Sequence, residues 1–489
     1  MAKRPAGAML GIELDPSSGT PLHRQLYARI KASILEGRLR PGDRLASTRT
    51  LAADLGLSRT TVMAAFEQLA AEGYLKGRIG AGTTVAEGIL PSPSAKRSSR
   101  SSPSRRRPRP AHRARAQESG VLPSEQPPAR PLRPGVPETA LVPLELWSRL
   151  ASRHWRRVSR NPQHADSRGY RPLREAICEH VARLRAVRCD ADQILIVGGA
   201  QQALYLCAHT LLDPGETAWM EDPGYPRARA AFAAAGVKVV PVPVDNDGLA
   251  VPVGLEGELP PRLIYLTPSF QCPLGVMLSL SRRFELLRLA AKRGAWIIED
   301  DYFSEYRYGS RPVPSLQSLD RDETVLYVGN FSKSVVPSLR IGYLILPPAL
   351  VEVFVRVRAA ISRQPTGVDQ AVLADFIREG HLDRHLRAVL RIYRERRQAL
   401  VTAIEEHAGD LLEPSAHGTG MYLVAWLKHG LDDRKAAAAA AASGVDVTPL
   451  SSFAVLPMQR GGLVLGFSSY QPSRIRVAVR QLADALKRL

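Results

Sequence analysis

The sequence predicts a multidomain protein in which a small helical head with a short β wing precedes a larger α/β body. Three observations lead to this prediction. The chain has 489 residues, which is more than one ordinary hydrophobic core needs. A stretch rich in Pro, Ser and Arg interrupts it near residue 100. Apolar residues recur with helical spacing before that stretch, and short apolar runs alternate with helical stretches after it.

The head is expected over residues 12–88. Its first helix starts at Pro21-Leu22, because apolar residues then recur every four positions, and it ends before Gly37. A second helix is predicted from Thr48 to Leu55 and a third from Ser58 to Glu72, with Ser58 as its N-cap. The glycine-rich segment Tyr74 to Val85 is typical of a β-hairpin.

Residues 89–134 are predicted to be a disordered basic linker. The segment PSPSAKRSSRSSPSRRRPRP has almost no large apolar side chains, so it cannot bury enough surface to offset the entropy of ordering the chain. Residues 91–117 carry nine Lys and Arg and no acid. Residues 1–90 carry 12 Lys and Arg against 8 Asp and Glu, so the basic excess lies at this end of the chain. Such an excess favours a nucleic-acid partner, although a generally Arg-rich proteome would also produce it.

The body is expected over residues 135–489. Predicted strands separated by helical stretches indicate a mostly parallel sheet covered on both faces. These strands are residues 194–197, 262–266, 295–298, 324–328 and 341–346.

Neither a membrane span nor a metal site is expected. No stretch approaches ~18 apolar residues without a charge, and residues 1–14 lack the apolar core of a secretion signal. The four cysteines form no C-x-x-C pair, so zinc ligation and a disulfide scaffold are not expected. We therefore expect a cytoplasmic protein.

Two helices joined by the short turn Gly56-Leu57 form a helix-turn-helix pattern. In that geometry the first residues of the second helix face base edges in the major groove. These residues are Ser58, Arg59, Thr60 and Thr61, and Arg49 begins the preceding helix. A capped surface helix with an Arg in its first turn is the alternative for this stretch alone.

The head as a whole resembles the GntR-type winged helix. The matching motifs are the G-x-L-x-P-G-D-x-L start, LGLSRTTV and the G-x-G-T wing, while Ala46 replaces a usual proline. The resemblance implies double-stranded operator DNA as a partner. It also implies DNA contacts from the recognition-helix residues above, from Arg49 and from the wing around Gly80, and association with the nucleoid.

Four features of the body would suit a phosphorylated aldehyde. Gly198-Gly199 opens a helix after a strand, where backbone N–H groups attract anions. Glu299-Asp300-Asp301 follows a buried strand, where a carboxylate can pair with a pyridinium nitrogen. Lys333 can form a Schiff base, and Arg340 can bind a phosphate. Taken singly, the acids fit a solvated loop equally well, and a lone lysine is usually on the surface.

The order of these features resembles the fold-type I aminotransferases, with large and small subdomains, and more closely the body of MocR-type regulators. Matching blocks include GYRPLREAI, GGAQQAL, EDPGYPRAR, TPSFQCPLG, IIEDDYFSEYRY and VGNFSKSVVPSLRIGYL. The resemblance implies pyridoxal 5'-phosphate held as an internal aldimine on Lys333, Asp300 on the ring nitrogen, Tyr302 on the ring hydroxyl and Tyr225 stacked on the ring. It assigns the phosphate to Ala200, Gln201, Ser332 and Arg340.

Several positions depart from the aminotransferase pattern. Cys272 stands where true aminotransferases usually have Asn, and strand 462–467 offers no arginine to the site. Phe270, Leu274 and Asn330 also differ from the residues commonly found there. Arg227 or Arg229 could bind a ligand carboxylate, but we favour surface positions for both.

We therefore expect a homodimeric transcription regulator that binds pyridoxal phosphate. Its small-molecule effector would be an amine, an amino acid or the cofactor itself, and any transaminase activity would be vestigial. The alternatives are a working pyridoxal-phosphate-dependent aminotransferase with an appended DNA-binding domain, and a plain regulator whose body has lost the cofactor.

Overall fold

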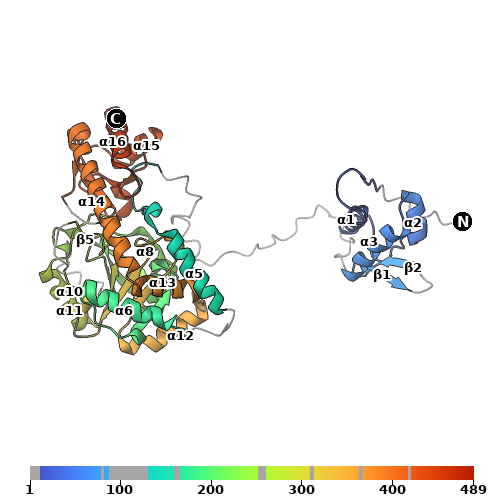
Figure 1. The fold of residues 1–489 in the computed structure, drawn as a ribbon, viewed down its shortest axis with the longest axis horizontal. Coiled ribbons are helices and arrows are strands. Elements are labelled where there is room, and N and C mark those ends of the chain that lie inside the picture. Colours follow the sequence, from blue (N-terminus) through green and yellow to red (C-terminus); the bar gives the residue numbers. More distant parts are fainter. Residues whose placement is uncertain are drawn as a thin grey trace, which may run out of the picture. The chain divides into compact units, whose positions relative to one another are not determined.

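The computed structural model describes residues 12–78, 82–87, 130–158, 166–251, 260–308, 313–362, 367–416 and 420–489. The chain divides into two units, residues 1–108 and residues 109–489 (Figure 1). The predicted linker falls mostly outside the described residues. Its last five residues, 130–134, are described and pack against the body: the backbone N–H of Gly466 donates to the carbonyl of Leu132 at 2.7 Å.

The head contains three helices and a two-stranded sheet: α1 (Leu22–Leu35), α2 (Thr48–Leu55), α3 (Arg59–Ala71), β1 (Leu75–Arg78) and β2 (Gly82–Val85). Gly56 ends α2 in the left-handed region (φ 64°), a conformation that costs glycine little, and the chain then turns directly into α3. The apolar stripe of α3, with Val62, Phe66 and Leu69 buried, packs on α1. The predicted helices and hairpin are confirmed.

An eight-stranded sheet forms the centre of the body. Its order is β3 (Ile194–Val197), β10 (Gly342–Ile345), β9 (Val325–Asn330), β8 (Trp296–Asp301), β7 (Leu263–Leu266), β4 (Thr217–Asp222), β5 (Lys238–Asp245) and β6 (Gly248–Leu249). The run from β9 to β5 is parallel, whereas β10 is antiparallel to both of its neighbours. The predicted mostly parallel sheet is confirmed.

Helices cover both faces of this sheet. The buried side chains of one face pack against α7 (Ala200–Leu211), α8 (Pro226–Ala234) and α12 (Val351–Ile361). The other face packs against a group consisting of α10 (Leu280–Arg293), α11 (Leu316–Leu319), α6 (Arg171–Arg185) and α13 (Gly367–Arg378). Because β4, β7, β8 and β9 run parallel, their carboxyl ends lie at one edge of this sheet.

A smaller subdomain follows the long helix α14 (His381–Ala408). Its antiparallel sheet has the order β11 (Leu412–Pro414), β12 (Tyr422–Leu427), β14 (Gly462–Gly466) and β13 (Thr448–Pro449). Helices α15 (Asp433–Ala442) and α16 (Pro472–Leu486) lie with α14 at this end of the body (Figure 1). The remaining long helix, α5 (Leu144–Val158), packs on α13.

No helix among the described residues is long and apolar enough to cross a membrane. No group of three or more His, Cys, Asp or Glu side chains within the described ranges could hold a metal ion.

Candidate cofactor site and DNA-binding head

The three acids at residues 299–301 lie within β8 and are buried, so the alternative of a solvated acidic loop is wrong. Glu299 accepts hydrogen bonds from the backbone N–H groups of Leu316 and Gln317, both at 2.9 Å. Asp301 accepts from the guanidinium of Arg185 at 2.7 Å, and this buried cation holds the pKa of Asp301 below its usual value. Both acids therefore have structural partners.

Asp300 differs from its two neighbours. Its Oδ2 accepts a hydrogen bond from the hydroxyl of Tyr265 at 2.8 Å, whereas its buried Oδ1 has no partner among the described residues. The side chain is only 3% exposed, and burial raises its pKa to about 7. A buried acceptor of this kind suits a charged N–H donor, such as a protonated pyridine nitrogen.

Lys333 follows β9 in the turn that begins at Phe331. Its Nζ donates to the carbonyl oxygen of Gly135 at 2.5 Å, and its own carbonyl accepts from the hydroxyl of Tyr306 at 2.8 Å. Burial and the positive charge of Arg227 lower the pKa of Lys333 to about 8. A lysine with such a pKa is partly neutral at physiological pH, as a nucleophilic amine must be.

An anion-binding corner lies where β3 runs into α7. Gly199 is the N-cap of α7 with φ 95°, and no side chain caps this helix end. A Cβ placed on Gly199 would lie 3.7 Å from Cζ of Arg340, so the guanidinium borders the start of the helix. Ala200 and Gln201 form the first turn, and the side chain of Gln201 donates to the carbonyl of Arg227 at 2.9 Å. The helix N-terminus and Arg340 together favour a phosphate.

Ser332 precedes Lys333 in the same turn. Its backbone N–H donates to the side-chain oxygen of Asn330 at 3.2 Å. Asn330, which replaces a frequent Thr, therefore fixes the backbone of the turn that carries the lysine.

The two tyrosines predicted to contact the ring come from different elements. Tyr225 is the N-cap of α8, and burial raises its pKa to about 12, with Asp300 and Arg340 among the charges that act on it. Tyr302 follows β8, and its hydroxyl lies 3.0 Å from that of Tyr422 on β12. Tyr422 also lies 3.7 Å from the sulfur of Cys272. Sequence positions from 225 to 422 thus meet in one site.

Sequence analysis missed three participants: Tyr265, Tyr422 and Gly135. Tyr265 looks like any apolar residue of a buried strand, and Tyr422 lies in the small subdomain, far away in sequence. Gly135 contributes only a carbonyl oxygen. No local pattern marks any of them, because their roles arise from contacts between distant segments.

Arg227 and Arg229 have different positions. Arg229 is half-buried and donates to the carbonyl of Phe453 at 2.8 Å, which is a structural contact. Arg227 is exposed, in agreement with the favoured surface position, yet its charge acts on both Lys333 and Tyr225. It therefore borders the site.

The residues fit pyridoxal phosphate. Asp300 offers a buried acceptor without a partner, Lys333 offers an amine with a lowered pKa, and the α7 N-terminus with Arg340 offers an anion site. Asp300 and Lys333 would hold the ring nitrogen and the aldehyde carbon, and the α7 corner would hold the phosphate.

The predicted DNA contacts of the head differ in their exposure and in their hydrogen bonds. Arg49, Arg59 and Thr60 are exposed at the N-termini of α2 and α3. The hydroxyl of Ser58 accepts from the backbone N–H of Thr61 at 3.1 Å and lies 2.8 Å from the Thr61 hydroxyl. The Ser58 hydroxyl also lies 2.7 Å from the Thr60 hydroxyl, so Ser58 caps the helix and contacts both threonines, whereas Arg59 is exposed outside this cluster. Gly80 lies outside the described residues.

Comparisons with known proteins agree with both halves. Residues 158–489 match the family model "Aminotransferase class I and II", and residues 22–85 match "Bacterial regulatory proteins, gntR family". Among solved structures, Pyrococcus horikoshii kynurenine aminotransferase has a TM-score of 0.69 and 26% identity, and the match covers 78% of this chain and 95% of that one.

Curated relatives match along nearly the whole chain. The "Probable rhizopine catabolism regulatory protein MocR" of Rhizobium meliloti is 40% identical, covering 96% of this chain and 95% of the relative. The transcriptional regulator TauR of Rhodobacter capsulatus is 34% identical, covering 97% and 98%. The pyridoxine biosynthesis transcriptional regulator PdxR of Corynebacterium glutamicum is 32% identical, covering 98% and 99%.

A winged-helix head joined to an aminotransferase-type body defines a DNA-binding transcription regulator built on the fold of a pyridoxal-phosphate-dependent enzyme family. The chain belongs to the MocR-type subfamily of the GntR regulators.

Proposed function

We propose that this regulator binds pyridoxal phosphate through Lys333 and responds to a small amine or amino acid that reaches the same site. The observation that carries the proposal is the buried Oδ1 of Asp300, which has no hydrogen-bond partner within the described part of the chain. A buried carboxylate without a cation is costly, and a positively charged ligand atom would remove that cost. When bound, the cofactor supplies an electrophilic carbon to amines.

The residues of the site would then have separate roles toward the cofactor. Asp300 would keep the ring nitrogen protonated, and Tyr265 fixes the orientation of that carboxylate. Tyr302, whose hydroxyl lies 3.0 Å from that of Tyr422, and Tyr225 would contact the ring. The α7 N-terminus, Ser332 and Arg340 would hold the phosphate. Arg227, at the border of the site, is positioned to attract an effector that carries an anionic group.

Binding rather than turnover is the expected role of this site. An efficient transaminase fixes the substrate carboxylate through both half-reactions. Strand β14 carries no arginine. Its Gly466 also leaves no room for a side chain, because a Cβ at this position would lie 2.0 Å from the carbonyl oxygen of Arg133. A regulator needs only a ligand whose affinity differs between two conformations.

We propose a homodimer on operator DNA as the functional form.

The test is covalent capture of the cofactor. Apoprotein mixed with pyridoxal phosphate should gain a visible absorption band, and reduction with borohydride followed by peptide mapping should place pyridoxyl on Lys333. Lys333→Ala should show neither result, whereas Lys292→Ala, at an exposed lysine of α10, should behave as wild type. Pyridoxyl on a different lysine would overturn the assignment. Sustained conversion of an amino acid at ~1 per second or faster would favour the aminotransferase alternative.

A further inference from the structure

Two cysteines lie side by side on the surface of the body, away from the cofactor contacts. Cys178 is on α6, and Cys189 is in the turn between α6 and β3. Their sulfur atoms are 3.6 Å apart, and the thiol of Cys178 lies 2.8 Å from the carbonyl oxygen of Cys189. Both residues are partly exposed, whereas Cys207 and Cys272 are 0% and 6% exposed.

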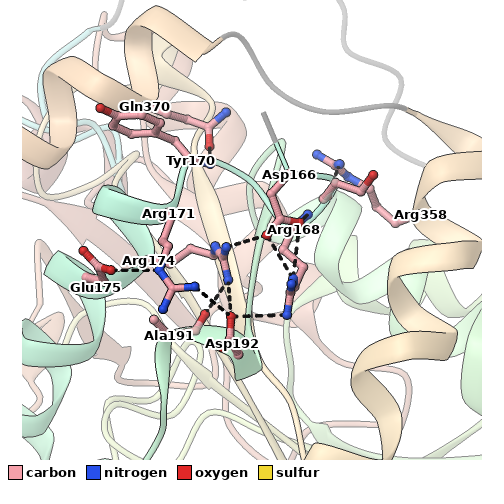
Figure 2. Close-up of polar contacts among 11 residues, drawn as sticks. Asp166, Arg168, Tyr170, Arg171, Arg174, Glu175, Ala191, Asp192, Arg358 and Gln370 are labelled. Atoms are coloured by element: carbon pink, nitrogen blue, oxygen red, sulfur yellow. Dashed lines mark hydrogen bonds and ion pairs between the residues drawn. The ribbon is translucent and has the colours of Figure 1, made fainter. Parts of the chain in front are cut away.

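The surrounding contacts hold this geometry in place. Arg174 lies one turn before Cys178 on α6, and its buried guanidinium donates to the carbonyl of Ala191 at 2.8 Å and to Asp192 at 3.2 Å (Figure 2). Another NH group of Arg174 donates to Asp166 at 2.6 Å. The helix that carries Cys178 is thus tied to the turn two residues beyond Cys189.

The other side of the turn is also fixed. Gln317 accepts from the backbone N–H of Arg188 at 3.0 Å and donates to the Arg188 carbonyl at 2.7 Å. Because both flanks of Cys189 are anchored, the two thiols do not separate without breaking several hydrogen bonds. A disulfide has a sulfur–sulfur distance of about 2.05 Å, so the sulfurs need to approach by only about 1.5 Å.

We propose that Cys178 and Cys189 form a redox-active dithiol that a hydroperoxide converts to an intrachain disulfide. In the first step the sulfur of one cysteine attacks an oxygen of hydrogen peroxide, the O–O bond breaks, and water leaves with formation of a sulfenic acid. In the second step the sulfur of the other cysteine attacks that sulfur and a second water leaves. The sum is two thiols and one hydrogen peroxide giving one disulfide and two waters.

Either thiol can take the first step, because the two sulfur atoms face each other at 3.6 Å and both residues are partly exposed. Burial and the neighbouring Cys178 raise the pKa of the Cys189 thiol. The charge of a Cys189 thiolate would act on Tyr343 of β10, whose ring stacks with Tyr327 of β9.

The experiment uses the reduced full-length protein under native conditions. It is treated with hydrogen peroxide, and the remaining thiols are alkylated after unfolding and mapped by mass spectrometry. We expect a 178–189 cross-linked peptide about 2 Da lighter than the two reduced peptides together, while Cys207 and Cys272 stay alkylatable. A thiol reductant should restore all four thiols, and the oxidised protein should melt at a higher temperature because the cross-link restricts the unfolded chain.

Single substitutions test whether both thiols are needed. Cys178→Ser and Cys189→Ser should each abolish the cross-link, and each should leave on the remaining cysteine a sulfenic acid that dimedone traps. Cys207→Ser is the matched control and should cross-link as wild type. The proposal is overturned if the cross-link appears only in denaturant, if Cys178 instead joins two chains, or if both thiols remain alkylatable after peroxide.

Discussion

At the scale of single residues, Asp300 and Asp301 show how adjacent carboxylates acquire opposite properties. Both are buried in β8, but Arg185 neutralises Asp301, whereas among the described residues Asp300 accepts a hydrogen bond only from the Tyr265 hydroxyl. The pKa of Asp300 is raised to about 7 and that of Asp301 is lowered. A raised pKa in the folded state favours the protonated form, so the contribution of Asp300 to apoprotein stability decreases as pH rises from about 4 through about 7.

The first prediction compares isosteric substitutions at these two positions. At pH 8, Asp300→Asn should leave the melting temperature of the apoprotein equal to or above that of wild type, because it removes an uncompensated buried charge. It should weaken pyridoxal-phosphate binding by ~10-fold or more, since the pyridinium partner is lost. Asp301→Asn should destabilise the protein by ~3–5 kcal/mol, because Arg185 is left buried without its partner. Thermal unfolding and cofactor titration measure these effects, and equal destabilisation by both changes would contradict the distinction.

The second prediction concerns the lysine. With a pKa of about 8, Lys333 is neutral in about one molecule in ten at pH 7, far more often than an ordinary lysine. Arg227→Ala removes a nearby positive charge, so the pKa of Lys333 should rise and cofactor capture at pH 7 should slow. The rate at which the visible band appears is measured from pH 6.5 to 9. The midpoint of the resulting rate–pH curve should lie at a higher pH for Arg227→Ala than for wild type. Arg229→Ala is the control, and superimposable profiles for wild type and Arg227→Ala would refute the idea.

At the scale of elements, the start of α3 combines a capping role and a recognition role. Ser58 bonds to the hydroxyls of Thr60 and Thr61 and closes the helix end, while the side chain of Arg59 is exposed outside this cluster. The cap holds the recognition residues at a fixed place on the helix. This division predicts different effects for neighbouring substitutions.

The third prediction separates those effects. Arg59→Ala should weaken operator binding by ~1–3 kcal/mol and relax sequence preference, because the side chain is placed at base edges. Ser58→Ala should mainly lower head stability, by ~1 kcal/mol, through loss of the N-cap. Gln68→Ala, at an exposed position further along α3, should change neither property. Binding isotherms on operator and scrambled DNA test this, and unchanged specificity in Arg59→Ala would show that α3 does not read the bases.

At the scale of the whole molecule, charge is distributed unevenly along the chain. Of the net charge of +20, nine positive charges without an acid lie at residues 91–117, within the linker and outside the described residues. Charges without a fixed geometry bind phosphates but do not read bases. The linker is therefore expected to add affinity without adding sequence preference.

The fourth prediction tests this expectation. Replacing Arg105, Arg106 and Arg107 with Ser should reduce the slope of binding affinity against salt concentration by about 2 to 3 and leave the preferred operator unchanged. The matched control removes the same charge from exposed positions of α14, by Ser at Arg387, Arg391 and Arg394. The control should keep a steeper slope than the linker variant. A changed operator preference in the linker variant would mean that the linker contacts bases.

The sequence by itself determined the three helices and hairpin of the head, the mostly parallel sheet and the family, and it predicts the division into head, linker and body. These features depend on local periodicity, on caps such as Ser58 and Gly56, and on motifs whose residues are close together in the chain. The candidate residues from Ala200 to Arg340 were also identifiable, because the family keeps them in a fixed order. Their roles stay predictions until the cofactor is measured.

Only the tertiary structure decided the surroundings that give these residues their chemistry. It moved residues 299–301 from a possible solvated loop into a buried strand, and it paired Asp300 with Tyr265 and Tyr302 with Tyr422. It also brought together Cys178 and Cys189, which share no sequence motif. Burial, pKa and side-chain contact are set by segments that are distant in sequence but packed against one another, so no local pattern encodes them.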